Sequence, residues 1–379
     1  MKIGIDVRLY GIKDRGIGRY TEKLITYLEK IDTQNEYFIF LRQDGFNDYQ
    51  PQNKNFHKVL ADYRPYSLKE QILFPCQLKK YKLNLVHFTH FNVPIFYGRS
   101  FIVTIHDLII TRFPESRKRS TTLPLPLYYL KLFFYNLVLK NALFKSKKIL
   151  AVSQATKKEI VDLFGVDTSK ISVIYEGVDQ LPVSSYQSPI LDSRFQILDS
   201  YFLYVGAAYP HKNLERLIIA FEKFIKNSDA PIGKKLKLVL VGKQDYFYQR
   251  IEELVEKLDI IGSVVFTGEV SDNNLASYYK HALFFIFPSL AEGFGLPVLE
   301  ALNHGLAVAS SSVYSLPEVL GRAAYYFDPH EIDDIAKAIE TMATDDKLRN
   351  DLKKEGIEQV KKFSWQKLAQ ETLEIYKRL

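Results

Sequence analysis

The run of residues best suited to chemistry lies in the second half of the chain. It reads Pro288-Ser-Leu-Ala-Glu-Gly-Phe-Gly-Leu-Pro-Val-Leu-Glu-Ala-Leu302 and follows a strand-like Phe-Phe-Ile-Phe at 284–287. Gly293 and Gly295 let the backbone turn tightly and approach a ligand. Pro297 suits the first helical position because it has no amide hydrogen to leave unpaired. Free amides at the start of a helix attract an anion, and phosphate fits this site best.

Two glutamates accompany these glycines. We expect Glu300 in the first turn of the helix, where its carboxylate accepts hydrogen bonds from two neighbouring hydroxyls, as on a ribose. Glu292 precedes the glycines and is expected to face a cleft from the loop itself. In a purely structural interpretation, Glu300 compensates the helix dipole and Glu292 is solvated. The run as a whole favours a ligand site.

Short β-branched and aromatic runs alternate with longer amphipathic stretches along the whole chain, which is typical of βα units around parallel sheets. The patterns predict strands at 2–7, 36–41, 84–88, 101–105, 148–152, 171–174, 201–206, 236–241, 264–267, 284–287 and 306–309. They predict helices from about 17 to 28 and at 213–226, 246–258, 272–280, 297–304, 331–342, 345–361 and 364–379.

The α/β pattern lapses once, in a polar, proline-punctuated stretch after Asp179. We therefore predict two Rossmann-like doubly wound domains, 1–180 and 201–363, joined by a linker at 181–200. The last segment, 364–379, has a capping serine and one apolar helical face, so it should pack back toward the first domain. Ligands of open α/β sheets bind at the carboxyl ends of the strands, which we expect to face each other across a cleft.

These motifs together resemble the donor-site signature of the retaining family 4 glycosyltransferases, which have the two-domain GT-B fold. The resemblance rests on Glu292-x7-Glu300 in its setting, on Leu316-Pro-Glu-Val319 downstream, and on Thr267-Gly-Glu-Val270 upstream. It extends from the first strand to the final helix.

The resemblance implies a role for each matching residue. Glu292 contacts the donor sugar, and Glu300 binds the ribose of the nucleotide. The remaining donor contacts are the diphosphate-binding amides of Phe294, Gly295 and Leu296 and the base-binding loop with Gly268 and Val270.

A lysine after the strand at 201–206 adds a cation to this site. Lys212 precedes a helix and can stabilise a diphosphate as negative charge develops on it. Relatives often pair this lysine with an arginine, but Ala207 and His211 stand at the matching places. Lys212 must carry this role unless another cation substitutes; its structural alternative is a solvated loop lysine.

The first half contributes two further elements by resemblance. Gly16 and Gly18 open a helix about ten residues after the first strand, where relatives have a loop that closes over the donor phosphates; the alternative is a simple helix-initiating turn. His106 follows the strand at 101–105 and matches a histidine that contacts the donor sugar, with Asp107 beside it to orient the ring or the acceptor. His87 and His90 have a metal-like spacing without further ligands, so we interpret them as structural.

Charge is distributed unevenly along the chain. Residues 1–180 carry 28 Lys and Arg against 17 Asp and Glu, whereas residues 181–379 carry 23 against 27. Between 112 and 148 there are nine basic residues and one acidic residue among aromatic and leucine-rich runs, a pattern typical of helices on anionic membranes, although the aromatics also suit a core. Cys76 is the single cysteine, and no signal-like segment follows Met1, so we expect a cytoplasmic protein, peripheral on the inner face of the membrane.

The sequence therefore predicts a retaining hexosyltransferase that moves a mannose-like sugar from a nucleotide-diphosphate sugar to a glycan or lipid-linked acceptor in surface polysaccharide synthesis. It requires no metal or other cofactor. Alternatives are an epimerase of nucleotide sugars on the same fold, a glycoside hydrolase that uses both glutamates, and a non-catalytic sugar-binding protein. Nucleic-acid binding would explain the basic half but leaves the glutamate motif without a role.

Overall fold

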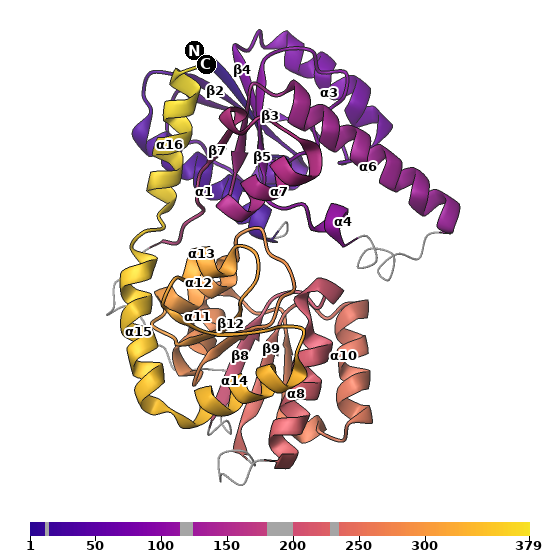
Figure 1. Cartoon of the computed structure of the whole chain (residues 1–379). Coiled ribbons are helices and arrows are strands. Elements are labelled where there is room, and N and C mark those ends of the chain that lie inside the picture. The colour runs from indigo at the N-terminus through magenta and orange to yellow at the C-terminus, as the bar shows by residue number, and fades with distance from the viewer. Residues whose placement is uncertain (12–14, 114–123, 180–199, 228–234) are drawn as a thin grey trace. The chain divides into compact units, whose positions relative to one another are not determined.

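The computed structural model describes residues 1–11, 15–113, 124–179, 200–227 and 235–379, and its chain forms two compact units (Figure 1). Within these residues the first unit comprises Met1–Thr111, 124–177 and Ser364–Leu379. The second comprises Val178–Phe363 together with Arg112 and Phe113. The proposed linker at 181–200 lies outside the described residues except for Ser200.

The first unit is built on a seven-stranded sheet in the order β3-β2-β1-β4-β5-β6-β7, and every pair of neighbouring strands is parallel. Its strands are β1 (Lys2–Asp6), β2 (Glu36–Leu41), β3 (Phe56–Leu60), β4 (Leu85–Phe88), β5 (Phe101–Ile105), β6 (Lys148–Ala151) and β7 (Ile171–Val173). The order reverses between β1 and β4, which is the switch point of a doubly wound sheet.

Helices on both faces cover this sheet, as the right-handed crossovers of parallel strands require. They are α1 (Arg15–Ile31), α2 (Gln43–Asp48), α3 (Leu68–Lys80), α4 (Ile109–Arg112), α6 (Leu125–Lys145), α7 (Gln154–Phe164), the 3₁₀ turn η2 (Thr168–Lys170) and α16 (Trp365–Lys377). The last of them, α16, is capped by Ser364 and packs against α1. Its Tyr376 is fully buried, and the Tyr376 hydroxyl lies 2.6 Å from His87 Nδ1 on β4.

The second unit repeats the design with six parallel strands in the order β10-β9-β8-β11-β12-β13. These are β8 (Tyr201–Val205), β9 (Lys237–Val241), β10 (Val264–Gly268), β11 (Phe285–Phe287), β12 (Val308–Ser311) and β13 (Ala324–Phe327). Its helices are η4 (Pro210–Lys212), α8 (Leu214–Asn227), α10 (Tyr246–Lys257), η5 (Ile261–Ser263), α11 (Asp272–His281), α12 (Leu296–Asn303), α13 (Leu316–Leu320), α14 (Ile332–Thr344) and α15 (Asp346–Val360).

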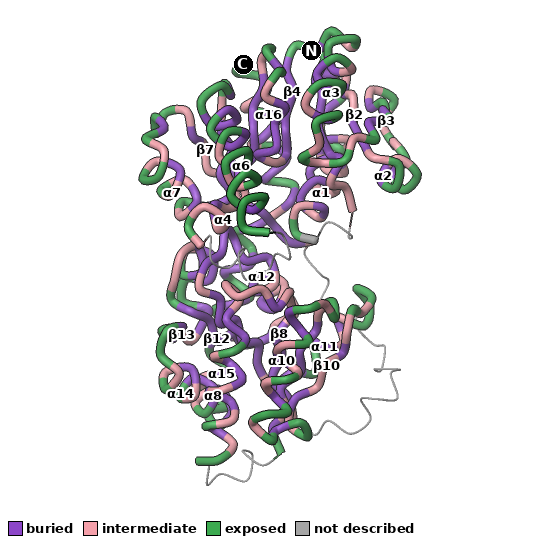
Figure 2. Tube along the Cα trace, turned by 90° about the vertical axis from the view of Figure 1, so that its right-hand side faces the viewer, coloured by how far each residue is buried: buried purple, intermediate pink, exposed green. Residues whose placement is uncertain are grey.

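The prediction of two Rossmann-like doubly wound α/β sheets is confirmed. Central strands such as β5 and β11 are buried along their whole length, which is why their apolar runs stand out in the sequence. Figure 2 shows buried residues along the labelled inner strands β4 and β12. Among the strands, the sequence patterns missed β3 and β13, each of which lies at one edge of its sheet. Both strands are only partly buried, so neither has a continuous apolar run that would mark it in the sequence. β3 carries His57 and Lys58 between its apolar residues, and the two middle residues of the four in β13 are half-buried.

One predicted strand was also displaced. The pattern placed it at 306–309, but the structure pairs Val308–Ser311 with β13. Ser310 and Ser311 are fully buried despite their hydroxyls, and Ser311 Oγ donates a hydrogen bond to the Ser289 carbonyl. This strand therefore ends on buried polar residues that hold the loop after β11.

Candidate functional site

The loop between β11 and α12 has a backbone that only glycine accommodates well. Gly295 has a φ of 98°, in the left-handed region, and stands directly before the first residue of α12. A Cβ on Gly295 would lie 2.9 Å from Leu316 Cδ2, so a larger residue would be both strained and crowded. In the following turn Val298 and Leu299 donate to the Gly295 carbonyl and Pro297 has no amide hydrogen, so Leu296 is the residue whose amide helical geometry leaves without an intrahelical acceptor. An amide of this kind at a helix start suits an anion.

Lys212 and Glu292 meet beside this loop. Lys212 ends the 3₁₀ turn η4 after β8, Glu292 lies on the loop after β11, and Lys212 Nζ is 2.6 Å from Glu292 Oε1. The Lys212 and Glu292 side chains are 17% and 9% exposed, so water screens the pair poorly. The ammonium group also lies 5.4 Å from the centre of the Phe287 ring. The arrangement holds one cation and one carboxylate at the carboxyl edge of neighbouring strands.

No second cation comes from His211 beside them. Burial, and then the charge of Lys212, lower the pKa of His211 to about 3, so its imidazole is neutral at physiological pH. The residue at the other expected position, Ala207, has no charge. Lys212 is therefore the cation that these sequence positions supply.

The side chains of Ser315 and Asn213 hold the loop between β11 and α12 through hydrogen bonds to its carbonyls. The sequence patterns missed both residues. Ser315 Oγ is buried within hydrogen-bond distance of two carbonyls, those of Glu292 at 3.0 Å and Phe294 at 3.2 Å. Asn213 has a φ of 63°, and its Nδ2 donates to the carbonyls of Pro288 and Pro329. The sequence did carry a signal for Asn213. Asparagine tolerates the left-handed backbone conformation that the residue after η4 adopts, so an asparagine at this turn could have been predicted to have a structural role.

Glu300 lies deeper in its helix than expected. Because α12 begins at Leu296 rather than at Pro297, Glu300 is the fifth helical residue and lies outside the first turn. The Tyr279 hydroxyl from α11 donates to Glu300 Oε2 at 3.2 Å, and the Tyr279 ring stacks on His304 with centroids 5.0 Å apart. Compensation of the helix dipole does not explain this placement, since the dipole effect fades beyond the first turn. A buried tyrosine orients the carboxylate instead.

Gly268 and Val270 lie at the end of β10, on the same carboxyl edge. Gly268 has a φ of 74° and nothing within 4 Å of where a Cβ would lie, and Val270 is half-buried. The loop ends where Ser271 caps α11, the helix that carries Tyr279. Helix α11 therefore connects the loop predicted to bind the base with Glu300, the carboxylate predicted to bind the ribose, because Tyr279 of α11 donates to Glu300.

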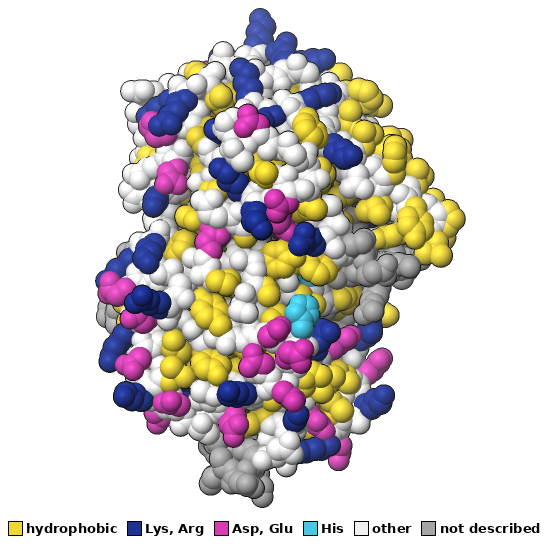
Figure 3. All heavy atoms as spheres, in the orientation of Figure 1, with side chains coloured by type: hydrophobic (Ala, Val, Ile, Leu, Met, Phe, Trp, Pro, Cys, Tyr) yellow, Lys and Arg dark blue, Asp and Glu magenta, His cyan; other side chains and the backbone are white. Residues whose placement is uncertain are grey.

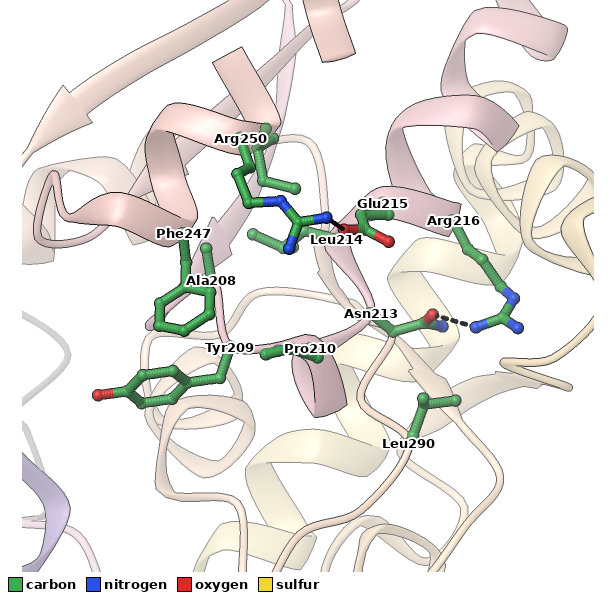
Figure 4. Close-up of a pocket in the computed structure, with 11 residues that line it drawn as sticks. Ala208, Tyr209, Pro210, Asn213, Leu214, Glu215, Arg216, Phe247, Arg250 and Leu290 are labelled. Carbon is green, nitrogen blue, oxygen red and sulfur yellow. Dashed lines mark hydrogen bonds and ion pairs between the residues drawn. The ribbon is translucent and has the colours of Figure 1, made fainter. Parts of the chain in front are cut away.

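A pocket of about 220 Å³ is lined by residues that flank Lys212 in the chain, Pro210 and Asn213, and by residues of α8 and α10 (Figure 4). Tyr209 and Phe247 form part of its wall, with ring centroids 5.1 Å apart. Arg250 pairs with Glu215 at 3.4 Å, and Arg216 Nη1 donates to Asn213 Oδ1 at 2.9 Å. Arg216 therefore contacts the asparagine that anchors the loop before Glu292.

In the first unit, His106 follows β5 as expected and has two protein partners. His106 Nδ1 lies 3.1 Å from Glu176 Oε1, and His106 Nε2 lies 2.9 Å from the Thr89 carbonyl oxygen. The sequence patterns missed Glu176, which follows β7; a carboxylate just after a strand was the available signal. Asp107 Oδ1 accepts a hydrogen bond from the Ile109 amide.

A buried ionic cluster, also missed, occupies the carboxyl edge of β1 in the same unit. Arg8 is 5% exposed, its Nε donates to Asp6 Oδ1 at 2.8 Å, and its Nη1 lies 2.6 Å from Glu70 Oε1. Asn92 Nδ2 also donates to Glu70 Oε1 at 2.7 Å. Burial raises the pKa of Glu70, and the nearby Arg8 opposes that rise. The sequence patterns predicted Asp6 only as part of the first strand.

Gly16 and Gly18 lie in the first turns of α1, Gly16 exposed and Gly18 buried. Thr21 Oγ1 lies within hydrogen-bond distance of the Gly18 carbonyl at 2.8 Å and the Leu9 carbonyl at 3.1 Å. The segment just before α1, 12–14, lies outside the described residues. The two glycines therefore belong to a helix start, whose amides point to the amino-terminal side.

His87 has the structural role that its setting suggested. Its Nε2 lies 2.8 Å from Thr104 Oγ1, its Nδ1 lies against Tyr376, and burial lowers its pKa to about 3. Within the described ranges, no three His, Cys, Asp or Glu side chains are grouped as a metal site requires. The predicted site residues thus divide into a donor set in the second unit and His106 with the two α1 glycines in the first.

Comparison with known proteins places both units in known families. Residues 195–359 match the model described as "Glycosyl transferases group 1", and residues 15–180 match "Glycosyltransferase Family 4". The O-antigen chain mannosyltransferase B of Escherichia coli is 30% identical over 386 residues, which cover 96% of this chain and 96% of that protein. The serotype-specific mannosyltransferase WbdA of Escherichia coli is 32% identical over 241 residues, or 62% of this chain and 29% of that protein.

A solved structure shows the same fold at lower identity. Sucrose-phosphate synthase from Thermosynechococcus elongatus matches with a TM-score of 0.77 and 20% identity, covering 100% of this chain and 98% of that one. At this identity the likeness concerns the fold alone.

Proposed function

Since the chain belongs to the family 4 glycosyltransferases, which have the GT-B fold, we propose that it transfers a mannose-like hexose from a nucleotide-diphosphate sugar to a surface glycan, with retention of configuration. The sugar and the glycan are suggested by the mannosyltransferases of O-antigen chains that it resembles over most of its length. The observation that carries the proposal is the Lys212–Glu292 pair beside the glycine-started helix α12.

In this proposal the donor diphosphate binds at the start of α12 and takes Lys212 as its counter-ion. The amides of Phe294, Gly295 and Leu296 receive the phosphate oxygens. As the bond to the sugar breaks, negative charge grows on the departing diphosphate, and fixed amide dipoles with a lysine stabilise it without reorganisation. Catalysis is then mainly electrostatic and positional.

Binding of the diphosphate to Lys212 also leaves Glu292 available to the donor sugar. In the structure its carboxylate accepts from Lys212; when a diphosphate neutralises Lys212, Glu292 can accept hydrogen bonds from sugar hydroxyls instead. Ser315 holds the Glu292 carbonyl, so the carboxylate can change partner while its backbone stays in place. Glu300, oriented by Tyr279, takes the ribose, and the loop with Gly268 and Val270 takes the base.

We assign the acceptor to the basic first unit, with His106 near the transferred sugar. A glycan or lipid-linked acceptor carrying phosphate would be attracted by the charge excess of residues 1–180. The enzyme would then work on the cytoplasmic face of the membrane.

The test is a donor screen followed by product analysis. Nucleoside diphosphates and their sugars should raise the melting temperature, with a guanosine or other mannose-carrying donor giving transfer to a glycan acceptor. NMR of the product should show the anomeric configuration of the donor. An inverted product would contradict retention, and isomerised donor without acceptor would support an epimerase instead.

A further inference from the structure

A small cavity, which we call the Asn92 cavity, lies at the carboxyl edge of the first sheet, where the strand order reverses between β1 and β4. Its volume is about 20 Å³, which is enough for one water-sized group. Its polar and aromatic lining residues come from the end of β1 and from the segments that follow β1, β3 and β4, and comprise Asp6, Arg8, Tyr66, Thr89, His90 and Asn92. Open α/β sheets bind their ligands at such a switch point. The cavity therefore has the place and the size for one polar group of a ligand.

Asn92 brings an unpaired acceptor to this cavity. The residue is 5% exposed, its Nδ2 donates to Glu70 Oε1 at 2.7 Å, and its Oδ1 has no hydrogen-bond partner in the described part of the chain. A buried amide oxygen without a donor is disfavoured, because it has lost its contact with water and gained no other hydrogen bond. Asn92 Oδ1 is therefore suited to a hydroxyl group that a ligand brings.

Arg8 supplies donors to the same cavity but no unbalanced positive charge. Its guanidinium contacts both carboxylate oxygens of Asp6 at 2.8 Å and Glu70 Oε1 at 2.6 Å. These contacts use three of the five N–H groups of an arginine. Because one guanidinium faces two carboxyl groups, a phosphate here would meet no unpaired cation. The lining suits a neutral group that both donates and accepts hydrogen bonds.

The charge excess of the first unit lies elsewhere, on its surface. Lys and Arg side chains are scattered over the upper part of Figure 3, where Figure 1 labels the elements of the first unit, whereas Arg8 is buried. Surface cations attract a phosphorylated acceptor at long range. The Asn92 cavity then recognises a neutral group of that acceptor at short range.

Tyr66 lines the cavity and also reaches solvent, in a backbone conformation that glycine normally adopts. Its φ is 64°, the residue is 56% exposed, and its amide donates to Glu70 Oε2 at 2.6 Å. The Tyr66 ring lies against His90 and Phe91, with centroids 6.4 and 6.2 Å away. Residues in a disfavoured backbone conformation cluster at ligand sites. The apolar face of a pyranose ring packs well on an exposed aromatic ring of this kind.

Thr89 connects the cavity to His106. Thr89 Oγ1 donates to the Asp6 carbonyl at 2.7 Å, and the Thr89 carbonyl oxygen lies 2.9 Å from His106 Nε2. One buried residue thus lines the cavity and contacts the histidine that the proposed function places near the transferred sugar. A sugar held at the cavity is therefore close to the proposed site of transfer.

We propose that the Asn92 cavity binds one non-reacting hydroxyl of the terminal sugar of the acceptor, whose ring packs on Tyr66. The hydroxyl donates to Asn92 Oδ1 and accepts from an N–H group of Arg8. This inference rests on the proposed function, since it names the group by which the first unit recognises the acceptor.

The experiment measures sugar binding to the full chain by saturation-transfer NMR, without a donor. The probes are the methyl α-glycosides of mannose, glucose, galactose and N-acetylglucosamine, with inorganic phosphate as a competitor. We expect at least one glycoside to bind and phosphate not to displace it. Among deoxy forms of that glycoside, the one without the anchored hydroxyl should bind about tenfold more weakly or worse. Binding of no glycoside, or displacement by phosphate, would overturn the proposal.

Two variants test the ring and the amide separately. Tyr66→Gly removes the ring where glycine has no backbone strain, so it should keep the melting temperature and weaken glycoside binding about three- to tenfold. Asn92→Ala should weaken binding of the full glycoside about tenfold and bind the full and the deoxy form alike. If Asn92→Ala still prefers the full glycoside, Asn92 does not hold that hydroxyl and the proposal fails.

Matched controls come from the same unit. Lys82→Gly changes another residue with a positive φ, 49°, and Asn141→Ala removes another buried amide side chain. Both should bind the glycoside like the wild type. Losses as large as those of Tyr66→Gly and Asn92→Ala would indicate a general effect on the unit and overturn the proposal.

Transfer kinetics separate this proposal from the proposed function. Tyr66→Gly and Asn92→Ala should raise the KM for the acceptor and leave the KM for the donor unchanged. An unchanged acceptor KM in both variants would remove the cavity from the acceptor site while the transfer activity stands. If no nucleotide sugar is transferred but both variants still lose glycoside binding, the sugar site stands and the proposed activity fails.

Discussion

Lys212 and Glu292 form a close ion pair although 80 positions separate them, with Lys212 Nζ 2.6 Å from Glu292 Oε1. The loops after β8 and β11 bring them together at the point where the strand order of the second sheet reverses. In the proposed function this pair exchanges partners when an anionic donor binds.

Replacing Lys212 with Met should lower kcat by about 10²–10³-fold, because the departing diphosphate loses its cation. It should also destabilise the fold by about 3 kcal/mol, since Glu292 is left buried and charged. Steady-state transfer and thermal unfolding measure the two effects. Lys223→Met, which removes an exposed ion pair with Asp333, is the control and should change neither much.

Adding Glu292→Gln to Lys212→Met separates stability from catalysis. The double variant has no unpaired buried charge, so its melting temperature should recover toward the wild type, while its transfer activity should stay low. Recovered activity would remove both residues from the mechanism.

Tyr279→Phe should weaken the binding of a nucleoside diphosphate by about three- to tenfold, because Glu300 loses a hydrogen bond worth roughly 1 kcal/mol. The turnover at saturating donor should change little. Isothermal titration measures the affinity. Tyr201→Phe removes another buried hydroxyl bond in the same unit, to the Tyr278 carbonyl, and should leave affinity unchanged; equal losses would indicate a general effect on the unit.

Gly295→Ala should abolish most donor binding and lower stability. An alanine at a φ of 98° is strained, and its Cβ would press on Leu316. Gly305→Ala is a sharp control because Gly305 also has a positive φ, 69°, but nothing lies within 4 Å of the added Cβ. It should cost some stability and leave donor affinity intact. If both variants bind donor alike, the start of α12 is not the diphosphate site.

Acid should destabilise the fold through its buried histidines. The pKa of His87 is about 3 in the folded chain and about 6.5 when unfolded, so below pH 6.5 the unfolded state binds more protons. The stability from neutral His87 is complete above pH 6.5 and is lost as pH falls toward 3. Urea unfolding at several pH values should show a slope that His87→Gln reduces by up to about 1.4 kcal/mol per pH unit.

The positions of most strands and the donor loop were predictable because both depend on local sequence. Apolar runs such as Phe284–Phe287 and the spacing from Glu292 to Glu300 are complete within one segment. The contacts that support this loop could not be predicted from local sequence. Ser315 and Tyr279 form hydrogen bonds with residues about twenty positions away, which only tertiary packing brings close. Glu176 is 70 positions from His106, and no periodicity connects them.

Helix α6 shows the opposite limit. The basic and aromatic segment 112–148 was typical of a helix on a membrane, but its aromatics suited a core as well, because composition does not distinguish a buried ring from an exposed one. Only the tertiary structure separates Tyr135, which is buried, from Phe133, which is exposed.

Because α16 belongs to the first unit, the two units are completed in a fixed order during synthesis. Ser364–Leu379 belong to the first unit, while the second ends at Phe363, so the first unit is interrupted in the chain by the second. During translation the second unit is complete before the first, whose His87 meets Tyr376 only when the last residues have emerged. A nascent chain truncated near residue 363 should therefore hold a finished second unit and an unfinished first unit.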